Sequence, residues 1–212
     1  QTGDLRRGVA VARLSYGSNT YPVCVEIAGA RMLLNQDGTV NLQIGATEIG
    51  QGSDTVFAQM AAETLGIPFE HIRVISTQDT DITAYDPGAF ASRQSYVAAP
   101  AVMQAASELR SKILAHAELI SHQPQWGLTL LNGNVVMAAQ PEMVLMSVAE
   151  VSMHAYYHQE IGVQLLAEIS HKTTTNPPAF GCTFVDLSVD IPLCKITINK
   201  IINLHDSGRI LN

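Results

Sequence analysis

The chain is organised around one glycine-rich stretch, Gly45-Ala46-Thr47-Glu48-Ile49-Gly50-Gln51-Gly52-Ser53-Asp54-Thr55. Apolar and polar residues alternate before it, over 40–44, and a helical pattern follows it, over 56–65. The stretch therefore predicts a turn that leads from a strand into a helix. Gly50 and Gly52 lack the Cβ atom that would hold a ligand away from the backbone. Gln51, which lies between them, can direct a neutral amide at a polar ring or a phosphate.

The start of the predicted helix is a candidate anion site. Ser53 is the predicted N-cap, and the unpaired N–H groups that follow it, together with the helix dipole, favour a negative charge. Glu48 is either a general base or a carboxylate that accepts hydrogen bonds from the turn. The alternative is an ordinary glycine-rich turn, because short glycine motifs often occur by chance. The stretch lacks the lysine of a P-loop and the third glycine of a dinucleotide fingerprint.

A second polar turn, Ala91-Ser92-Arg93-Gln94-Ser95, opens a helical pattern that reaches about residue 119. Ser92 is its predicted N-cap, and Pro100 marks either the first turn of the regular helix or a kink. Arg93 suits a phosphate, or it forms a salt bridge with an aspartate of the preceding loop. Two strand–loop–helix units thus each carry a polar turn, and we expect the two turns to converge on one anionic ligand.

The composition excludes several classes of protein. The chain has 212 residues, of which 47% are hydrophobic and 15% are charged, so it can bury a core and is not disordered. The net charge of -7 argues against a nucleic-acid-binding surface. No apolar run approaches the ~18 residues of a membrane span. The three cysteines are too few and too widely spaced for a zinc or iron–sulfur site, which predicts buried thiols in a reducing, cytoplasmic compartment.

We predict an α+β fold of mixed β-sheets backed by helices, in two related lobes, 1–122 and 123–212. The first lobe carries both polar turns, and the second is truncated at its C-terminus. Hydrophobic periodicity predicts the individual elements. Strands are expected over 9–17, 23–34, 39–44, 71–76, 128–131, 135–138, 161–169, 183–191 and 195–204, and helices over 54–65, 91–119 and 147–157.

Two groups of polar residues suggest metal sites, and for both we prefer a simpler interpretation. The loop over 77–90 contains Asp79, Asp81 and Asp86, but EF-hand spacing is absent, so a solvated loop is expected. His154 and His158 are four residues apart on a predicted helix. Because the glutamate of an H-E-x-x-H motif is missing, we expect these histidines to be solvated or locally hydrogen-bonded.

Four separated segments resemble the molybdenum-binding subunit of the xanthine dehydrogenase and aldehyde oxidase family. Thr47–Gly52 is similar to its T-E-x-G-Q-G signature, and Ala91–Ser95 is similar to its second cofactor-binding turn. Arg6–Val11 resembles the start of the second half of that subunit. Residues 182–187 and 205–212 resemble later strands and a D-x-G-x-x-x-N element. The order and the approximate spacing of the segments also agree with the family.

The resemblance implies a molybdopterin-type molybdenum cofactor, including the option of its cytosine dinucleotide form. Gln51 would hydrogen-bond the pterin, while Gly50 and Gly52 allow the backbone to approach it. The residues of the second turn that would line its other side are Ala91, Ser92, Arg93 and Gln94. The pterin holds the metal in this family, so no metal ligand is expected from the protein.

The resemblance also implies the reaction and the partners. The parent enzyme would hydroxylate purines such as xanthine or hypoxanthine, related N-heterocycles or aldehydes, with water as the oxygen source. It would act with FAD-binding and iron–sulfur subunits or domains, because three cysteines cannot hold those clusters. Neither nucleic acid nor a membrane is an expected partner.

The catalytic glutamate of the family lies in a G-E-P segment beyond the point that corresponds to Asn212. We therefore expect no catalytic residue in this chain, and we expect the chain to be a fragment that is inactive alone. The absence of an initiator Met at Gln1 fits this expectation. The alternatives are a non-catalytic molybdopterin- or nucleotide-binding module, the remnant of a truncated gene, or a structural subunit in which both turns are ordinary.

Overall fold

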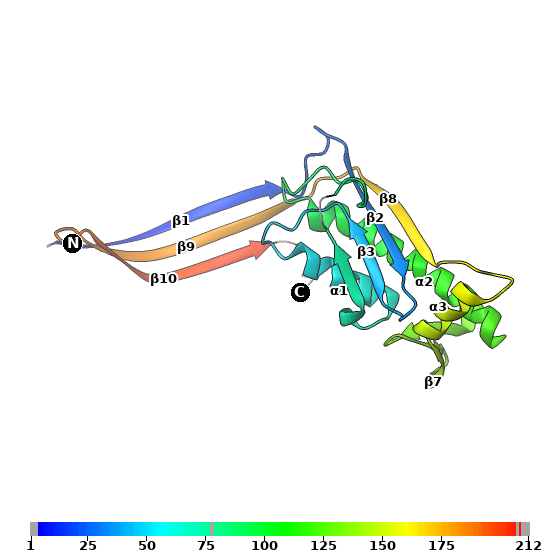
Figure 1. The fold of residues 1–212 in the computed structure, drawn as a ribbon. Coiled ribbons are helices and arrows are strands. Elements are labelled where there is room, and N and C mark those ends of the chain that lie inside the picture. Colours follow the sequence, from blue (N-terminus) through cyan, green and yellow to red (C-terminus); the bar gives the residue numbers. More distant parts are fainter. Residues whose placement is uncertain (1–3, 77–78, 207, 209–212) are drawn as a thin grey trace. The chain divides into compact units, whose positions relative to one another are not determined.

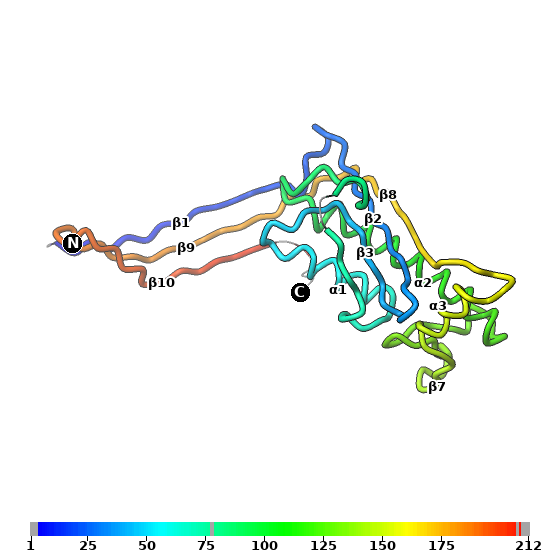
Figure 2. The backbone as a smooth tube through the Cα atoms, viewed as in Figure 1, coloured from blue at the N-terminus to red at the C-terminus, as the bar shows by residue number. Residues whose placement is uncertain are grey.

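A computed structural model describes residues 4–76, 79–206 and 208. The chain divides into two compact units, one made of Gln1–Ser18 with Thr175–Asn212 and the other of Asn19–Thr174. Figure 2 traces the backbone through both.

The described residues contain ten strands, three α-helices and three short helical turns. The strands are β1 (Leu5–Gly17), β2 (Glu26–Leu34), β3 (Val40–Ile44), β4 (Ile72–Ile75), β5 (Leu128–Leu131), β6 (Asn134–Met137), β7 (Gln140–Ser147), β8 (Leu166–Thr173), β9 (Pro178–Asp190) and β10 (Lys195–Asp206). The helices are α1 (Ser53–Leu65), α2 (Ala99–Ser121) and α3 (Val148–Tyr157). The short turns are a π-helical turn over Gln94–Ala98 and 3-10 turns over Phe69–His71 and Gln125–Gly127.

A four-stranded mixed sheet in the order β4-β3-β2-β8 is the framework of the unit 19–174. Strand β2 pairs antiparallel with β3 across the turn at Asp37-Gly38, as predicted. Strand β4 pairs parallel with β3, and α1 makes the crossover between them. The glycine-rich stretch thus follows the carboxyl end of a strand in a parallel unit, which is the edge where ligands bind in open α/β sheets.

Helices α1 and α2 pack against each other and against this sheet (Figure 1). Apolar residues at four-residue spacing line the buried face of α2 and include Ala101, Ala105, Leu109 and Ile113. Pro100 lies in the first turn of α2, where its missing N–H costs no hydrogen bond. Gly66 ends α1 in the left-handed region, as expected of a glycine C-cap.

A second, antiparallel sheet, β5-β6-β7, leads into α3. The side chain of Ser147 accepts a hydrogen bond from the backbone N–H of Glu150, and the Glu150 carboxylate accepts one from the N–H of Ser147. This capping box fixes the start of α3 close to the predicted position.

The other unit contains a single antiparallel sheet, β1-β9-β10, whose strands lie side by side along their whole length (Figure 1). None of its described strand residues is buried. Arg7 and Asp186 form an ion pair across β1 and β9, and the hydrogen bond from Arg7 lowers the pKa of Asp186 to about 2. This sheet has no hydrophobic core of its own.

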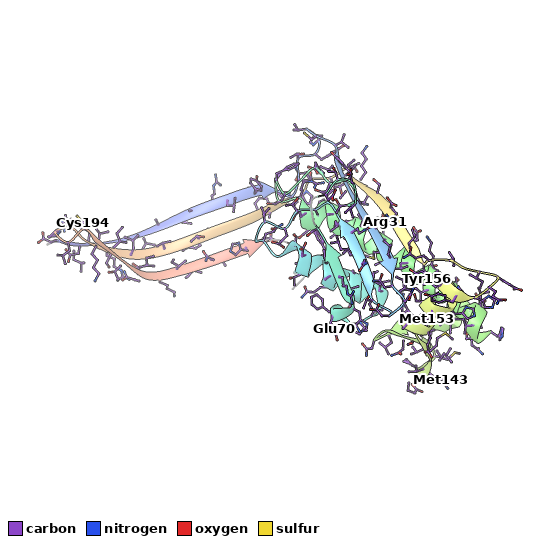
Figure 3. The ribbon with its side chains drawn as sticks, viewed as in Figure 1. Arg31, Glu70, Met143, Met153, Tyr156 and Cys194 are labelled. Atoms are coloured by element: carbon purple, nitrogen blue, oxygen red, sulfur yellow. The ribbon has the colours of Figure 1, made fainter. Side chains whose placement is uncertain are left out.

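The fold class is confirmed, with mixed sheets and helices, but several details differ from prediction. The two units do not follow the expected boundary between 122 and 123, because β1 pairs with β9 and β2 pairs with β8. The division into functional lobes 1–122 and 123–212 stays a prediction. Strand β8 begins at Leu166, later than expected, and Cys24 and Cys194 are exposed thiols, although we predicted buried ones (Figure 3 labels Cys194).

Candidate functional site

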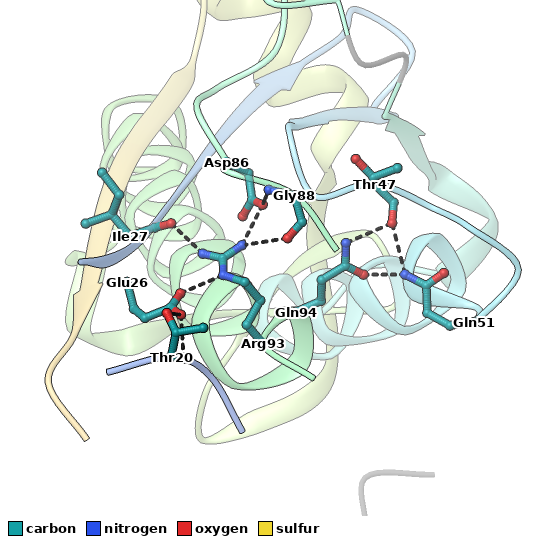
Figure 4. A network of polar contacts seen from close by, with 9 residues as sticks. All are labelled: Thr20, Glu26, Ile27, Thr47, Gln51, Asp86, Gly88, Arg93 and Gln94. Atoms are coloured by element: carbon teal, nitrogen blue, oxygen red, sulfur yellow. Dashed lines mark hydrogen bonds and ion pairs between the residues drawn. The ribbon is translucent and has the colours of Figure 1, made fainter. Parts of the chain in front are cut away.

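The two predicted polar turns meet in space. The side-chain amide of Gln94 donates a hydrogen bond to the carbonyl oxygen of Thr47, at 2.8 Å. Gln51 donates to the same carbonyl oxygen, at 2.9 Å, and to the side-chain oxygen of Gln94 (Figure 4). The expected convergence of the two turns is therefore confirmed. Two carboxamides and one backbone carbonyl link the first turn to the second.

Gly50 and Gly52 provide an open backbone surface in the first turn. Both have positive φ, +98° and +84°, and a Cβ atom added to either would meet no heavy atom within 4 Å. Their conformation disfavours other residues, and the space above them is free for a ligand. Gly45 differs, because its Cβ would lie 2.2 Å from the carbonyl oxygen of Ala84. This glycine allows the loop before the second turn to pack against the first.

The carboxylate of Glu48 takes up the donors at the start of α1. It accepts hydrogen bonds from the backbone N–H groups of Gly50, Gly52 and Asp54 at 2.6, 3.1 and 3.2 Å. The prediction that Ser53 is the N-cap was wrong, because Gly52 occupies that position in the left-handed region and Ser53 makes no side-chain cap. The chain thus supplies its own anion at this helix terminus. Of the two interpretations left open for Glu48, the structure shows the carboxylate that accepts hydrogen bonds from the turn.

The hydrogen bonds from Gly52 and Asp54 hold the pKa of Glu48 below its ordinary value. They outweigh the small effect of burial, which raises the pKa. The carboxylate is therefore ionised at neutral pH. A base must bind protons near the working pH, so Glu48 is poorly suited to act as a general base.

Arg93 is entirely buried and forms ion pairs with two carboxylates (Figure 4). Its Nε donates to Glu26 on β2, and one terminal nitrogen donates to Asp86, both at 2.6 Å. The other terminal nitrogen donates to the carbonyl oxygen of Ile27 at 2.6 Å. Of the two interpretations left open for Arg93, the structure shows the salt bridge. The side chain of Asp86 is fully buried, so the prediction that all three loop aspartates are solvated was wrong.

The charges in this ion-pair network stabilise one another. Burial by itself raises the pKa of Glu26, but hydrogen bonds from Thr20 and Arg93 outweigh it, and the pKa lies below its ordinary value. For Arg93, burial by itself lowers the pKa, but the hydrogen bonds and charges of Asp86 and Glu26 outweigh this effect. The pKa of Arg93 therefore lies above its ordinary value, and the guanidinium stays charged. Arg93 therefore fixes the second turn to β2 and to the loop that precedes it.

The second turn presents unpaired backbone donors. Ala91 and Ser92 have positive φ, 49° and 56°, and Arg93 returns to the right-handed helical region. Within the described part of the chain, neither Ala91 nor Ser92 donates a backbone hydrogen bond to another residue, whereas the N–H of Arg93 donates to Phe90. The prediction that Ser92 is an N-cap was wrong, because its backbone is left-handed and a π-helical turn follows it. Successive N–H groups in such a conformation form a concave anion site.

Three features of the site suit a large polar ligand with an anionic group. The N–H groups of Ala91 and Ser92 can donate to an anion, and the backbone at Gly50 and Gly52 leaves room for a flat ring. Among the described residues, the side-chain oxygen of Gln51 accepts a hydrogen bond only from the N–H of Ile49, at 2.7 Å, so one of its two lone pairs remains. The residues present therefore fit a pterin with a phosphate group.

The described residues also include metal-ligating side chains and a pair of histidines, His154 and His158. Among the residues that the structure describes, no group of three or more His, Cys, Asp or Glu side chains could hold a metal ion. His158 accepts a local hydrogen bond from the backbone N–H of Glu160 at 3.4 Å, as expected, and its ring stacks on that of His154. The hydrogen bond of His154 is instead with the distant, buried His116 on α2, at 3.0 Å. Within the same described ranges, no helix is both long and apolar enough to cross a membrane.

Comparison with known proteins identifies the family. The sequence profile of the molybdopterin cofactor-binding domain matches residues 1–212. The chain belongs to this family. The xanthine dehydrogenase molybdenum-binding subunit of Escherichia coli O157:H7 is 66% identical over 212 residues, which are 100% of this chain and 28% of that subunit. The nicotine 6-hydroxylase large subunit of Paenarthrobacter nicotinovorans is 30% identical over 190 residues, which are 86% of this chain and 23% of that subunit.

The fold of this cofactor-binding domain agrees with a solved structure. Quinoline 2-oxidoreductase from Pseudomonas putida 86 superposes with a TM-score of 0.82 at 22% identity, over 99% of this chain and 28% of that one. This likeness concerns the fold alone. The chain thus spans between 23% and 28% of the length of these relatives.

Sequence reasoning missed the residues that hold the second turn in place. Glu26 lies in a segment read only as an apolar strand, and a lone acid in such a segment is a signal that a buried partner exists. Asp86 was expected to be solvated with Asp79 and Asp81, although one of these loop aspartates was also the alternative partner of Arg93. The D-x-G-x-x-x-N element, over 206–212, lies mostly outside the described residues.

Replacing Arg93 with Met should strongly destabilise the cofactor-binding domain, because Glu26 and Asp86 would keep buried charges without a partner. Breaking a buried pair in this way costs about 3–5 kcal/mol in free energy of unfolding. Urea unfolding followed by circular dichroism measures this quantity. Arg73→Met is the matched control, since its pair with Asp37 is exposed and worth only about 0–1 kcal/mol. Equal losses in the two variants would contradict the role assigned to Arg93.

Glu48 should make the protein less stable as the pH falls. Its pKa is lower in the folded protein than in the unfolded chain, so its contribution is complete above the unfolded value, about 4.3, and is lost as the pH falls through the folded value. Glu48→Gln should therefore reduce stability at pH 7 and make little difference in strong acid. Unfolding curves of both proteins across this range check the prediction. A constant difference at every pH would show that the carboxylate charge is not involved.

Proposed function

We propose that this chain forms part of the cofactor-binding region in the catalytic subunit of a molybdopterin-dependent hydroxylase. The observation that carries the proposal is the meeting of the Gln51 and Gln94 turns in a member of this family. Two motifs that are 43 residues apart share one carbonyl oxygen and one amide–amide contact. Each presents backbone to a ligand, the first through its glycines and the second through unpaired N–H groups.

Each residue of the site would make a different contribution to binding the cofactor. Ala91 and Ser92 donate backbone hydrogen bonds to an anionic group, and Gly50 and Gly52 let the ring approach the chain. Gln51 accepts a hydrogen bond through its free lone pair. Arg93 holds the second turn in position through Glu26 and Asp86 and does not touch the ligand through its side chain. Bound molybdenum cofactor would supply the oxygen-transfer chemistry, with water as the source of oxygen.

The proposed substrates are purines such as xanthine or hypoxanthine, followed by related N-heterocycles and aldehydes. The 66% identity with a xanthine dehydrogenase subunit favours the purines, and the weaker likeness to a nicotine hydroxylase subunit extends the range to other N-heterocycles. FAD-binding and iron–sulfur subunits or domains are the proposed partners, because the three cysteines of this chain cannot ligate such clusters. The pterin would carry either no nucleotide or a cytosine dinucleotide.

A second candidate is a non-catalytic module that binds molybdopterin or a nucleotide in storage or assembly. Both candidates need an occupied site, and they differ in whether a base is supplied from elsewhere in the polypeptide.

Cofactor content tests whether the two turns bind molybdopterin. In the longest natural form of the polypeptide, Gln51→Ala should lower the bound molybdenum and pterin several-fold, because it removes both a ligand contact and the link to Gln94. Ser92→Trp should have a similar effect by covering the unpaired N–H groups. Metal analysis of the purified protein and fluorescence of the oxidised pterin give the two quantities.

Matched variants separate binding from folding. Gln140→Ala changes an exposed glutamine on β7, and Ser92→Gly keeps a residue that tolerates positive φ. Both should retain normal molybdenum and pterin. Full cofactor content in Gln51→Ala and in Ser92→Trp would defeat the proposed binding site.

The gene sequence around this segment distinguishes the enzyme from the module. An enzyme of this family should encode a G-E-P segment downstream, since its glutamate would act as the general base. Sequencing the reading frame past Asn212 shows whether it is there. A stop codon without such a segment would favour the module or a truncated gene.

A further inference from the structure

Three histidine side chains lie in contact where α3 packs on α2 (Figure 1). His116 is on α2 and is only 5% exposed. Its Nε2 atom lies 3.0 Å from Nδ1 of His154 on α3, and the rings of His154 and His158 stack with their centroids 4.6 Å apart. We name these three residues the histidine cluster. The cluster links two helices whose hydrogen-bonded histidines are 38 residues apart in the sequence.

The hydrogen bond between His116 and His154 depends on how many protons the two rings hold. A neutral imidazole has one donor nitrogen and one acceptor nitrogen, whereas an imidazolium has two donors. One nitrogen of the pair must therefore accept while the other donates. When both rings are charged, two N–H groups of like charge face each other at 3.0 Å. The contact is thus compatible with at most one positive charge on the pair.

Neighbouring charges do not offset a second positive charge on this pair. Within the part of the chain that the structure describes, no carboxylate forms an ion pair with a ring of the cluster. Lys112, one helical turn before His116, pairs with Glu108, and the carboxylate of Glu150 caps α3. The other charged or titratable side chains on the adjoining segments are Arg110, Glu118 and His122 on and after α2, Tyr156 and Tyr157 on α3, Glu160 after it, Glu168, His171 and Lys172 on β8, and Asp37 on the turn that contacts α3.

The ring of His116 is neutral at pH 7. Burial lowers its pKa, and charge on His154 and on His158 lowers the pKa further. A groove of about 420 Å³ gives water a route to the ring, and residues 163–166 form one of its walls. These residues follow α3, to which the N–H of Val163 is hydrogen-bonded through the carbonyl oxygen of Ala155, at 2.8 Å. Movement of α3 with this segment would widen the groove and hydrate His116.

Helix α3 is the partner that can separate at least cost. It has ten residues, and those that it buries are small: Val148, Val151, Ser152 and Ala155. Burial of so little apolar surface stabilises the contact less than the long buried face of α2 stabilises the packing of that helix on the sheet. The hydroxyl of Ser152 is also buried without a hydrogen-bond partner among the described residues, which costs further stability.

We propose that the histidine cluster makes the contact between α3 and α2 sensitive to pH. Near neutral pH the two rings share one hydrogen bond and α3 stays packed. In mild acid a second proton on the pair breaks that bond, and α3 with residues 158–165 separates from α2 while the rest of the unit 19–174 stays folded. The inference goes beyond the proposed function and does not depend on the cofactor.

The pH range of the change follows from His116. Its pKa is lower in the folded protein than the unfolded value of about 6.5, so the stabilisation by the neutral ring is complete above that value and is lost as the pH falls through the folded value. Opening should therefore begin below about pH 6.5. Each proton taken up on opening raises the opened population up to about tenfold per pH unit.

Hydrogen exchange followed by mass spectrometry measures this opening in the longest natural form of the polypeptide. After correction for the intrinsic exchange rate, peptides from 148–165 should exchange several-fold faster at about pH 5.5 than at about pH 7.5. Peptides from α1, over 53–65, should exchange at the same corrected rate at both pH values. Equal corrected rates for 148–165 would overturn the proposal, and so would equal acceleration in α1, since that would be unfolding of the whole unit.

Variants test whether the histidine cluster causes the response. His116→Gln keeps a side chain that can donate or accept but cannot be protonated, so it should abolish the acceleration in 148–165. His154→Gln should do the same from the other helix, and it decides the matter if His116→Gln fails to fold. His122→Asn is the matched control, because His122 is exposed at the end of α2 and asparagine tolerates its φ of 56°.

The control should keep the full response to pH. An undiminished response in folded His116→Gln or His154→Gln would show that other groups cause the opening and would overturn the proposal. Loss of the cofactor in a protein with the normal pH response would count against the proposed function alone.

Discussion

The buried ion pairs of Arg93 are the interaction on which the candidate site depends. One guanidinium connects β2, through Glu26 and the carbonyl oxygen of Ile27, with the loop that carries Asp86. Charges are costly to bury, and the cost is offset only when each one has a partner and further hydrogen bonds. Here the guanidinium also donates to the carbonyl oxygen of Gly88 at 3.2 Å. The second turn is consequently held at a fixed place beside the sheet.

The two turns differ in which of their hydrogen-bond donors and charges are already paired within the chain. In the first, the donors at the start of α1 are satisfied by Glu48, so an external anion would compete with a carboxylate that is already in place. In the second, Arg93 is neutralised by two acids, and the backbone N–H groups of Ala91 and Ser92 have no partner in the part of the chain that the structure describes. The proposed binding mode follows from this difference: the anionic group of the ligand would lie at the second turn, and its flat ring over the glycines of the first.

The two compact units differ in what stabilises them. The unit 19–174 has a core of buried side chains between its helices and sheet, and hydrophobic burial of this kind is the main favourable term in folding. The described strands of the sheet β1-β9-β10 are held by strand pairing and by the ion pair between Arg7 and Asp186, and none of their residues is buried. Three strands without a covered hydrophobic face are at the limit of independent stability.

The sequence by itself determined the local structure and the family. Alternation and four-residue spacing identified most strands and helices, and Gly66, Pro100 and the turn at Asp37-Gly38 ended or began them as expected. The order of the motifs at Thr47–Gly52 and Ala91–Ser95 pointed to a molybdopterin cofactor. These features depend on neighbouring residues, whose backbone preferences and spacing can be read along the chain.

Only the tertiary structure decided how the charges are paired and where the helices begin. Arg93 lies 67 residues from Glu26, and no local pattern states which acid a buried arginine will meet. Ser53 and Ser92 were predicted to be N-caps. At the start of α1, the Glu48 carboxylate accepts the hydrogen bonds that Ser53 would have accepted, and Ser92 has a left-handed backbone that an N-cap does not adopt. The contact between Gln51 and Gln94 likewise required the β3-α1-β4 crossover to bring two distant turns together. Pairing over such distances is set by packing of the whole domain, because each side chain meets only the partners that the fold places within reach.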